Sequence, residues 1–139
     1  RLVSRDERSL CLPTCLHGHL RQYHISDRAT PKLTGQLWLG GLLGKPGDAG
    51  RDLNGGPQML QLSRDGRRVY WTNSLYSTWD DQFYPDGVPG VEVMANVGRN
   101  GGLELDKDYF VSFPDGYRAH QIRLEGGDCS TDSFCYPSV

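Results

Sequence analysis

The sequence predicts an all-β protein made of about two four-stranded antiparallel sheets, arranged as blades of a β-propeller. The first observation is a repeat, because SRDERSLCLPTCLH (residues 4–17) returns as SRDGRRVYWTNSLY (residues 63–76). The second is the presence of 18 glycines and 8 prolines in 139 residues, which favours short strands joined by turns. The third is the lack of any long stretch with clean helical periodicity. A repeat in such a chain is typical of stacked or radially arranged β-units.

The second copy of the repeat predicts four strands in order. SRDG (63–66) is a turn, in which Asp65 accepts backbone hydrogen bonds and Gly66 supplies a positive φ. A glycine-rich connector, residues 98–106, separates the last two strands. We predict one antiparallel sheet from the segments 57–62, 67–74, 90–97 and 108–113.

The first copy predicts the same series one unit earlier. Its strands are the end of a segment at residues 2–4, followed by residues 9–15, 20–26 and 32–40. Blade 1 then covers roughly residues 2–40 and blade 2 roughly residues 55–113. A further blade begins at residues 118–127 and leads into a C-terminal tail that ends at residue 139.

Four strands in about 60 residues is the pattern of a propeller blade. A β-sandwich is the alternative, because short strands alone do not separate the two architectures. Propellers close with about four to eight blades, so we expect this chain to be the C-terminal piece of a larger protein. Without the N-terminal blades we expect it to be inactive and marginally stable.

The predicted topology gathers polar side chains at one face. His17 and Tyr76 follow equivalent strands of the two units, and His120 stands at the entry to the next strand. Asp80 and Asp81, in the long loop after Tyr76, emerge on the same face. Histidine pairs bind copper, zinc or iron, whereas the structural alternative is a hydrogen-bonded surface histidine or a loop-capping aspartate. We assign structural roles to the other two histidines, His19 and His24, because they lie along a strand and its lead-in.

The cysteines and the charge exclude several classes of protein. The spacings C-x3-C (Cys11, Cys15) and C-x5-C (Cys129, Cys135) differ from those of a zinc ribbon, and we expect Cys11 and Cys15 to be free or buried thiols. A net charge of −2 and a pI near 6.1 give no sign of nucleic acid binding. No apolar run is long enough to span a bilayer.

Several segments together resemble one known family. TNSLYSTWDDQFYP (72–85) and AHQIRLEGGDCSTD (119–132) are the most specific, and LHGHLRQYHISD (16–27) and KLTGQLWLGG (32–41) add to them. They resemble the C-terminal part of the selenium-binding protein family, whose members include methanethiol oxidase. This chain departs from the usual family residues at four positions, which are Cys11, Cys15, His19 and His24.

The resemblance implies a β-propeller and a copper-dependent oxidase, which converts methanethiol, O₂ and water into formaldehyde, hydrogen sulfide and hydrogen peroxide. It implies that His120 is a metal ligand and that His17 matches a family histidine, with further ligands in the N-terminal half of the family. Cys129, in a tight glycine turn, is a candidate for contact with a thiol or selenium or for orienting the metal ligands; a structural role is the alternative. The implied compartment is periplasmic for a bacterial enzyme and cytoplasmic otherwise.

Two functions remain open at this point. One is a fragment of a copper enzyme that oxidises a small thiol. The other is a non-catalytic propeller that carries selenium or thiols or serves as a protein-interaction scaffold, with structural histidines. The fold hosts both kinds of function and does not decide between them.

Overall fold

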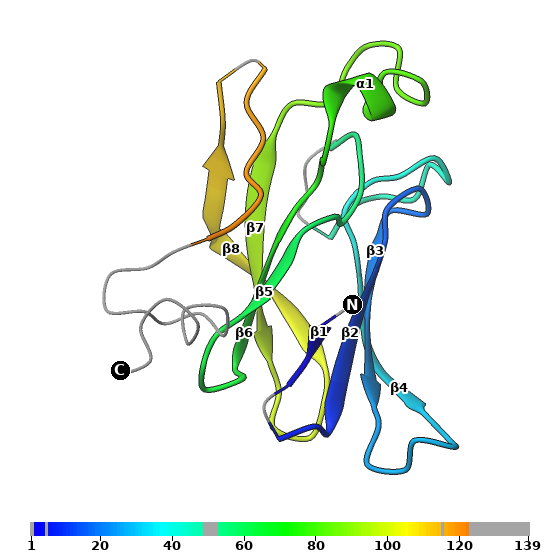
Figure 1. Ribbon diagram of the computed structural model, residues 1–139, viewed down its shortest axis with the longest axis vertical. Helices are drawn as coiled ribbons and strands as arrows, with labels where there is room; N and C mark the ends of the chain where they lie inside the picture. Colours follow the sequence, from blue (N-terminus) through cyan, green and yellow to red (C-terminus); the bar gives the residue numbers. More distant parts are fainter. Residues whose placement is uncertain (1, 5, 49–52, 115, 123–139) are drawn as a thin grey trace.

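The computed structural model describes residues 2–4, 6–48, 53–114 and 116–122, and it is almost entirely β-structure (Figure 1). One four-stranded sheet has the order β1-β2-β3-β4, and a second has the order β5-β6-β7-β8. The first sheet consists of β1 (Leu2–Val3), β2 (Ser9–Thr14), β3 (His19–His24) and β4 (Lys32–Trp38). The second consists of β5 (Leu60–Leu62), β6 (Arg68–Thr72), β7 (Val91–Val97) and β8 (Leu103–Ser112). A single-turn helix, α1 (Ser77–Asp80), lies in the loop between β6 and β7.

The sequence repeat appears as two equivalent sheets in which every neighbouring pair of strands is antiparallel. The prediction that four segments between residues 57 and 113 form one sheet is confirmed. The predicted start of its last strand was wrong, because β8 begins at Leu103 and not at residue 108. Val97 pairs with Leu103 across the glycine turn, so the ladder extends into the segment that was predicted as a connector.

The twin SRDx turns explain the most similar part of the repeat. The Ser4 hydroxyl donates to Asp6 Oδ1 and the Ser63 hydroxyl donates to Asp65 Oδ1, each at 2.6 Å. These hydrogen bonds hold the pKa of both carboxyls below the usual range. The first turn therefore keeps the geometry of the second, although a non-glycine residue, Glu7, takes a positive φ of 55° where Gly66 has 72°.

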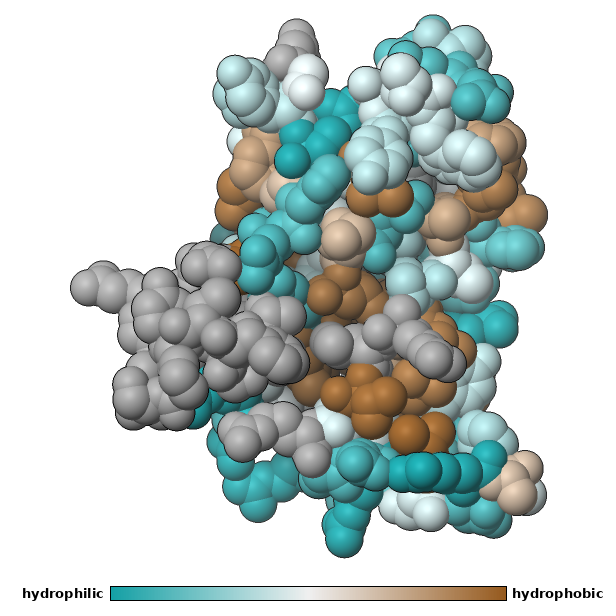
Figure 2. All heavy atoms as spheres, in the orientation of Figure 1, coloured by the Kyte–Doolittle hydropathy of each residue, from teal (hydrophilic) through white to brown (hydrophobic). Residues whose placement is uncertain are grey.

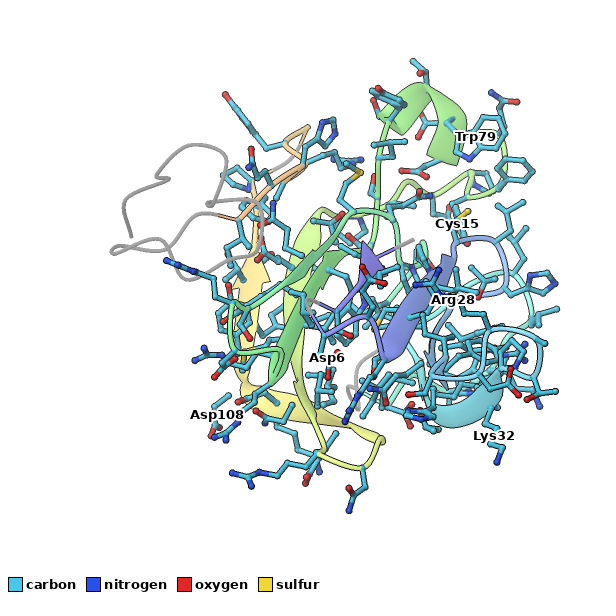
Figure 3. The ribbon with its side chains drawn as sticks, turned by 60° about the horizontal axis from the view of Figure 1, so that its bottom comes forward. Asp6, Cys15, Arg28, Lys32, Trp79 and Asp108 are labelled. Atoms are coloured by element: carbon cyan, nitrogen blue, oxygen red, sulfur yellow. The ribbon has the colours of Figure 1, made fainter. Side chains whose placement is uncertain are left out.

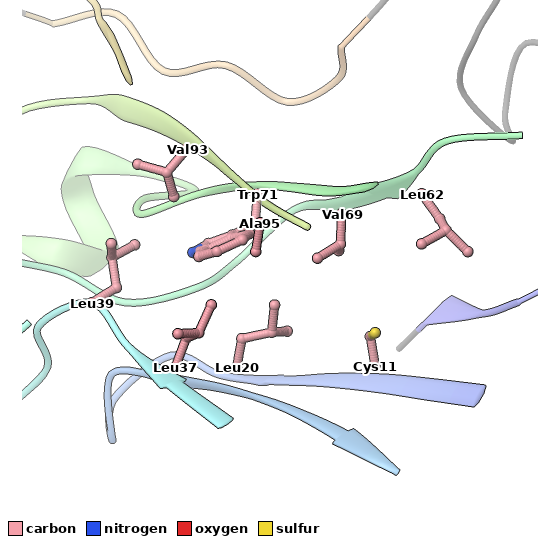
Figure 4. Close-up of a cluster of buried hydrophobic side chains, with 9 residues drawn as sticks. All are labelled: Cys11, Leu20, Leu37, Leu39, Leu62, Val69, Trp71, Val93 and Ala95. Atoms are coloured by element: carbon pink, nitrogen blue, oxygen red, sulfur yellow. The ribbon is translucent and has the colours of Figure 1, made fainter. Parts of the chain in front are cut away.

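The two sheets pack face to face around one apolar core (Figure 4). Side chains alternate along each strand, so residues at every second position point from one sheet toward the other. Trp71, in the second sheet, is 1% exposed, and Leu20, in the first, is fully buried. Burying a side chain of this size stabilises the fold by about 1.5–3 kcal/mol. The buried core consists of Cys11, Leu20, Leu37, Leu39, Leu62, Val69, Trp71, Val93 and Ala95.

The strand β2 has apolar side chains on both of its faces. Cys11 points into the core, so Leu10 and Leu12 point to the opposite face of the first sheet, where they are half-buried. Figure 2 shows apolar surface gathered over β1 and β2. Apolar side chains on both faces are typical of a sheet that is covered on both sides.

The segment after β8 crosses the other face of the second sheet. Ile122 packs against the buried pair Tyr70 and Met94, together with Tyr109. A strand was predicted over residues 118–127, but its described part, residues 118–122, is not in a strand. The remainder of that prediction, with Cys129 and Cys135, lies outside the described residues.

Candidate functional site

Two equivalent turns carry the aromatic side chains of the candidate site. His17 lies in the turn between β2 and β3, and Tyr76 lies between β6 and α1. Both turns are at the same end of the two sheets (Figure 1). Figure 3 shows Cys15, from the first turn, near Trp79 of α1 at that end, whereas Lys32 and Asp108 lie at the opposite end. The repeat therefore places unlike residues at corresponding positions of one surface.

His120 is held against the second of these turns. Its ring contacts the Tyr76 ring edge-on, with centroids 5.8 Å apart and planes at 86°. Its Nε2 lies 2.8 Å from the backbone oxygen of Leu75. A carbonyl oxygen only accepts, so Nε2 carries the proton and donates it, and in the neutral ring Nδ1 keeps its lone pair. This is the arrangement in which metal-binding histidines are oriented by a backbone carbonyl.

A buried polar network anchors the segment that carries His120. Arg118 Nε donates to Ser74 Oγ at 2.6 Å, and the Ser74 hydroxyl donates to the Asp80 carboxylate. Ser74 is 1% exposed and Asp80 is 3% exposed. Asp80 therefore organises this loop and is not oriented as an open metal ligand, which favours the structural role for that residue. The network connects residues that are 44 positions apart in the chain.

The first turn holds a second aromatic pair. The exposed His17 ring lies 6.0 Å from the ring of His19, measured between centroids, and the planes are tilted by 49°. His19 is 4% exposed and contacts Trp38 edge-on at 4.7 Å. Burial is the main cause that lowers the pKa of His19, and the charge of Arg21 adds to it, so the neutral ring is favoured.

Sequence reasoning gave His19 a structural role and missed its contact with His17. The signal was the triplet His17-Gly18-His19, in which a positive φ of 81° at the glycine turns the chain between the two rings. His24 is exposed at the far end of β3 and takes no part in the site. Cys11 and Cys15 are free thiols, and burial raises the pKa of Cys11 to about 11, so it remains protonated.

The described residues include part of a metal site at most. Within residues 2–4, 6–48, 53–114 and 116–122, no three His, Cys, Asp or Glu side chains come together as ligands of one ion. The imidazoles of His17, His19 and His120 nevertheless have the donor chemistry that suits copper. Cys129, the other candidate residue, lies outside this part of the chain.

Comparison with known proteins identifies the family to which the chain belongs. The model of the family "56kDa selenium binding protein (SBP56)" matches residues 1–135. The chain belongs to this family. Methanethiol oxidase of Homo sapiens is 46% identical over 94% of the chain, and selenium-binding protein 1 of Arabidopsis thaliana is 43% identical over the same share.

A solved SBP56 relative has the same local structure. The X-ray structure of a hypothetical selenium-binding protein from Sulfolobus tokodaii is 53% identical, covers 92% of this chain and superposes with a TM-score of 0.83. The chain spans 28% of that structure, and 33% and 32% of the human and plant relatives. The described part of the chain has no helix that is long and apolar enough to cross a membrane.

Proposed function

We propose that this chain is part of a copper-dependent methanethiol oxidase. The reaction converts methanethiol, O₂ and water into formaldehyde, hydrogen sulfide and hydrogen peroxide, which balances in atoms. The names of several relatives support the activity, among them the human methanethiol oxidase. Because the chain spans about a third of that protein, the activity belongs to the proposal for the whole molecule.

The arrangement of the sheets supports a β-propeller as the setting of the site. The two sheets are stacked with their strands in the same order, so that β1 contacts β5 and β4 contacts β8. Neighbouring blades of a propeller stack in this way, with inner strands beside inner strands and outer beside outer. The apolar outer face of β2 and its neighbours provides a surface for a preceding blade.

The observation that carries the proposal is the geometry of His120. Its ring is fixed by the Leu75 carbonyl and by Tyr76, and its Nδ1 is the nitrogen for copper. His17 stands on the equivalent turn of the first sheet as a second ligand, and further ligands come from the rest of the propeller. Copper, when bound, supplies thiolate coordination and redox chemistry with O₂.

Other residues of this chain act by positioning His120. The Arg118–Ser74–Asp80 network holds the His120 segment, and the Leu75 carbonyl keeps the proton on Nε2. A ligand placed by such contacts loses little freedom when the metal binds.

The test is to supply the intact protein with methanethiol and O₂, before and after copper is removed by a chelator and restored. We expect hydrogen sulfide and hydrogen peroxide in equal amounts, lost with the copper and regained with it. Retention of methanethiol without turnover in the copper-loaded protein would instead favour a non-catalytic selenium or thiol carrier.

A further inference from the structure

The His19 side chain lacks the partners that a buried imidazole normally has. Both ring nitrogens are buried, and neither has a hydrogen-bond partner among the described residues. Buried polar side chains are hydrogen-bonded in the large majority of cases, and a neutral imidazole offers one donor and one acceptor. The ring therefore keeps an unshared nitrogen lone pair inside the protein.

The neighbouring ring lies at a distance that fits a shared metal ion. Metal–nitrogen bonds of about 2.0–2.1 Å, with angles between tetrahedral and linear, place two imidazole centroids about 5–6.5 Å apart. The centroids of His17 and His19 are 6.0 Å apart. Trp38 packs against His19, whereas His17 is exposed and gives an ion a route from solvent.

The turn between the two histidines is fixed by its own contacts. Gly18 N donates to the Thr14 carbonyl at 2.8 Å, and Leu39 N donates to the Gly18 carbonyl at 2.8 Å. A Cβ at Gly18 would lie 1.8 Å from the backbone oxygen of Gly40. The backbone that follows β4 therefore packs directly on this turn. The fold therefore fixes the backbone positions that carry the two rings before any ion binds.

We propose that His17 and His19 together bind one first-row transition metal ion, each through one ring nitrogen. Imidazole ligands suit copper, zinc and nickel, and the affinity order of these ions makes copper(II) the tightest. The exposed side of the ion stays open to water or to a thiol. The inference rests on the proposed role of His17 as a metal ligand, adds His19 to it, and is independent of the oxidase reaction.

The test compares metal binding by three variants of the intact protein. Calorimetric titrations with Cu²⁺ and with Zn²⁺ are performed on H17N, H19N and H24N, the last a matched control on the same strand. Loss of a group that only orients a ligand weakens metal binding about 10–100-fold, so loss of a ligand should cost at least as much. We expect this weakening in H17N and H19N and unchanged affinity in H24N.

The outcomes separate this inference from the proposed function. If H17N loses metal and H19N binds it as tightly as the unmodified protein does, the inference is overturned and the copper proposal for His17 stands. Unchanged binding in both variants overturns the inference and the proposed role of His17. Because H19N alters a buried residue, imidazole ¹H–¹⁵N spectra of the unmodified protein provide a second measurement. One equivalent of Zn²⁺ should shift the ¹⁵N resonance of a His19 ring nitrogen. Bound Zn²⁺ without such a shift contradicts the proposal.

Discussion

The Nε2 atom of His120 lies 2.8 Å from the backbone oxygen of Leu75, although the two residues are 45 positions apart in the chain. The contact joins the segment after β8 to the turn after β6, next to Tyr76. It determines which ring nitrogen of His120 carries the proton and which keeps its lone pair.

We predict that neutral His120 has its proton on Nε2 in the metal-free protein. The Leu75 carbonyl accepts that hydrogen bond and stabilises this tautomer. Imidazole ¹H–¹⁵N spectra measure the tautomer, with His24 as an exposed reference on the same protein. A protonated Nδ1 in the metal-free neutral ring would contradict the assignment of Nδ1 as the metal-binding atom.

Replacement of Gly18 by alanine should destabilise the first turn severely. Both Gly18 and Gly66 have positive φ, which costs a non-glycine residue about 1–2 kcal/mol. Gly18 also packs on the Gly40 backbone, whereas a Cβ at Gly66 meets nothing within 4 Å. Urea unfolding should show a loss of about 2–5 kcal/mol for G18A and about 1–2 kcal/mol for G66A. Equal losses in the two variants would argue against the close approach at Gly18.

The twin turns should make the fold sensitive to acid. The pKa of Asp65 is lowered from 3.8 mainly by the Ser63 hydroxyl, and that of Asp6 mainly by the Ser4 hydroxyl. Because the folded-state pKa is the lower one, this stability is complete above about pH 4 and is lost as the pH falls through the lowered value.

Unfolding experiments between pH 2 and 7 test this prediction with D65N and with the exposed D108N as its control. We expect D65N to flatten the acid limb of the stability curve and D108N to leave it unchanged. The effect should be small because Asp65 is about half exposed. An acid limb that is as steep in D65N as in the unmodified protein would exclude the turn as its source.

Replacement of Ser74 by alanine should loosen the segment that carries His120. The change removes the hydroxyl between Arg118 and the buried Asp80, and it leaves that carboxylate without this donor. We expect a loss of about 1–3 kcal/mol in urea unfolding, together with faster hydrogen exchange around Arg118. S112A, on the exposed end of β8, is the control. Unchanged stability in S74A would show that Arg118 and Asp80 do not depend on the hydroxyl.

The sheets were predictable because their signals are local. The Ser-Arg-Asp turns and the alternation along residues 90–97 predict the hairpins directly. The early start of β8 was missed, because Leu103 and Leu105 follow a glycine cluster that also fits a loop. The helix α1 has four residues, which is too short for a 3.6-residue period to show.

The candidate site was predictable only in outline. The repeat placed Tyr76 and His120 at one face, and the structure has their rings in contact. The contact of His17 with His19 was missed, because strand alternation was applied to His19 although the bend at Gly18 precedes it. The bond from Arg118 to Ser74 depends on how a distant segment docks, and no local pattern encodes that.

The most direct test of the proposed site is copper analysis of the intact protein with H120A, using H24A as the control. His120 is held by Leu75 and Tyr76 at the end of the sheets where His17 lies, whereas His24 is exposed at the far end of β3. Plasma emission spectrometry of the purified variants, together with thiol oxidase assays, should show copper and activity lost in H120A and retained in H24A. Full copper occupancy in a folded H120A protein would contradict the assignment of His120 as a ligand.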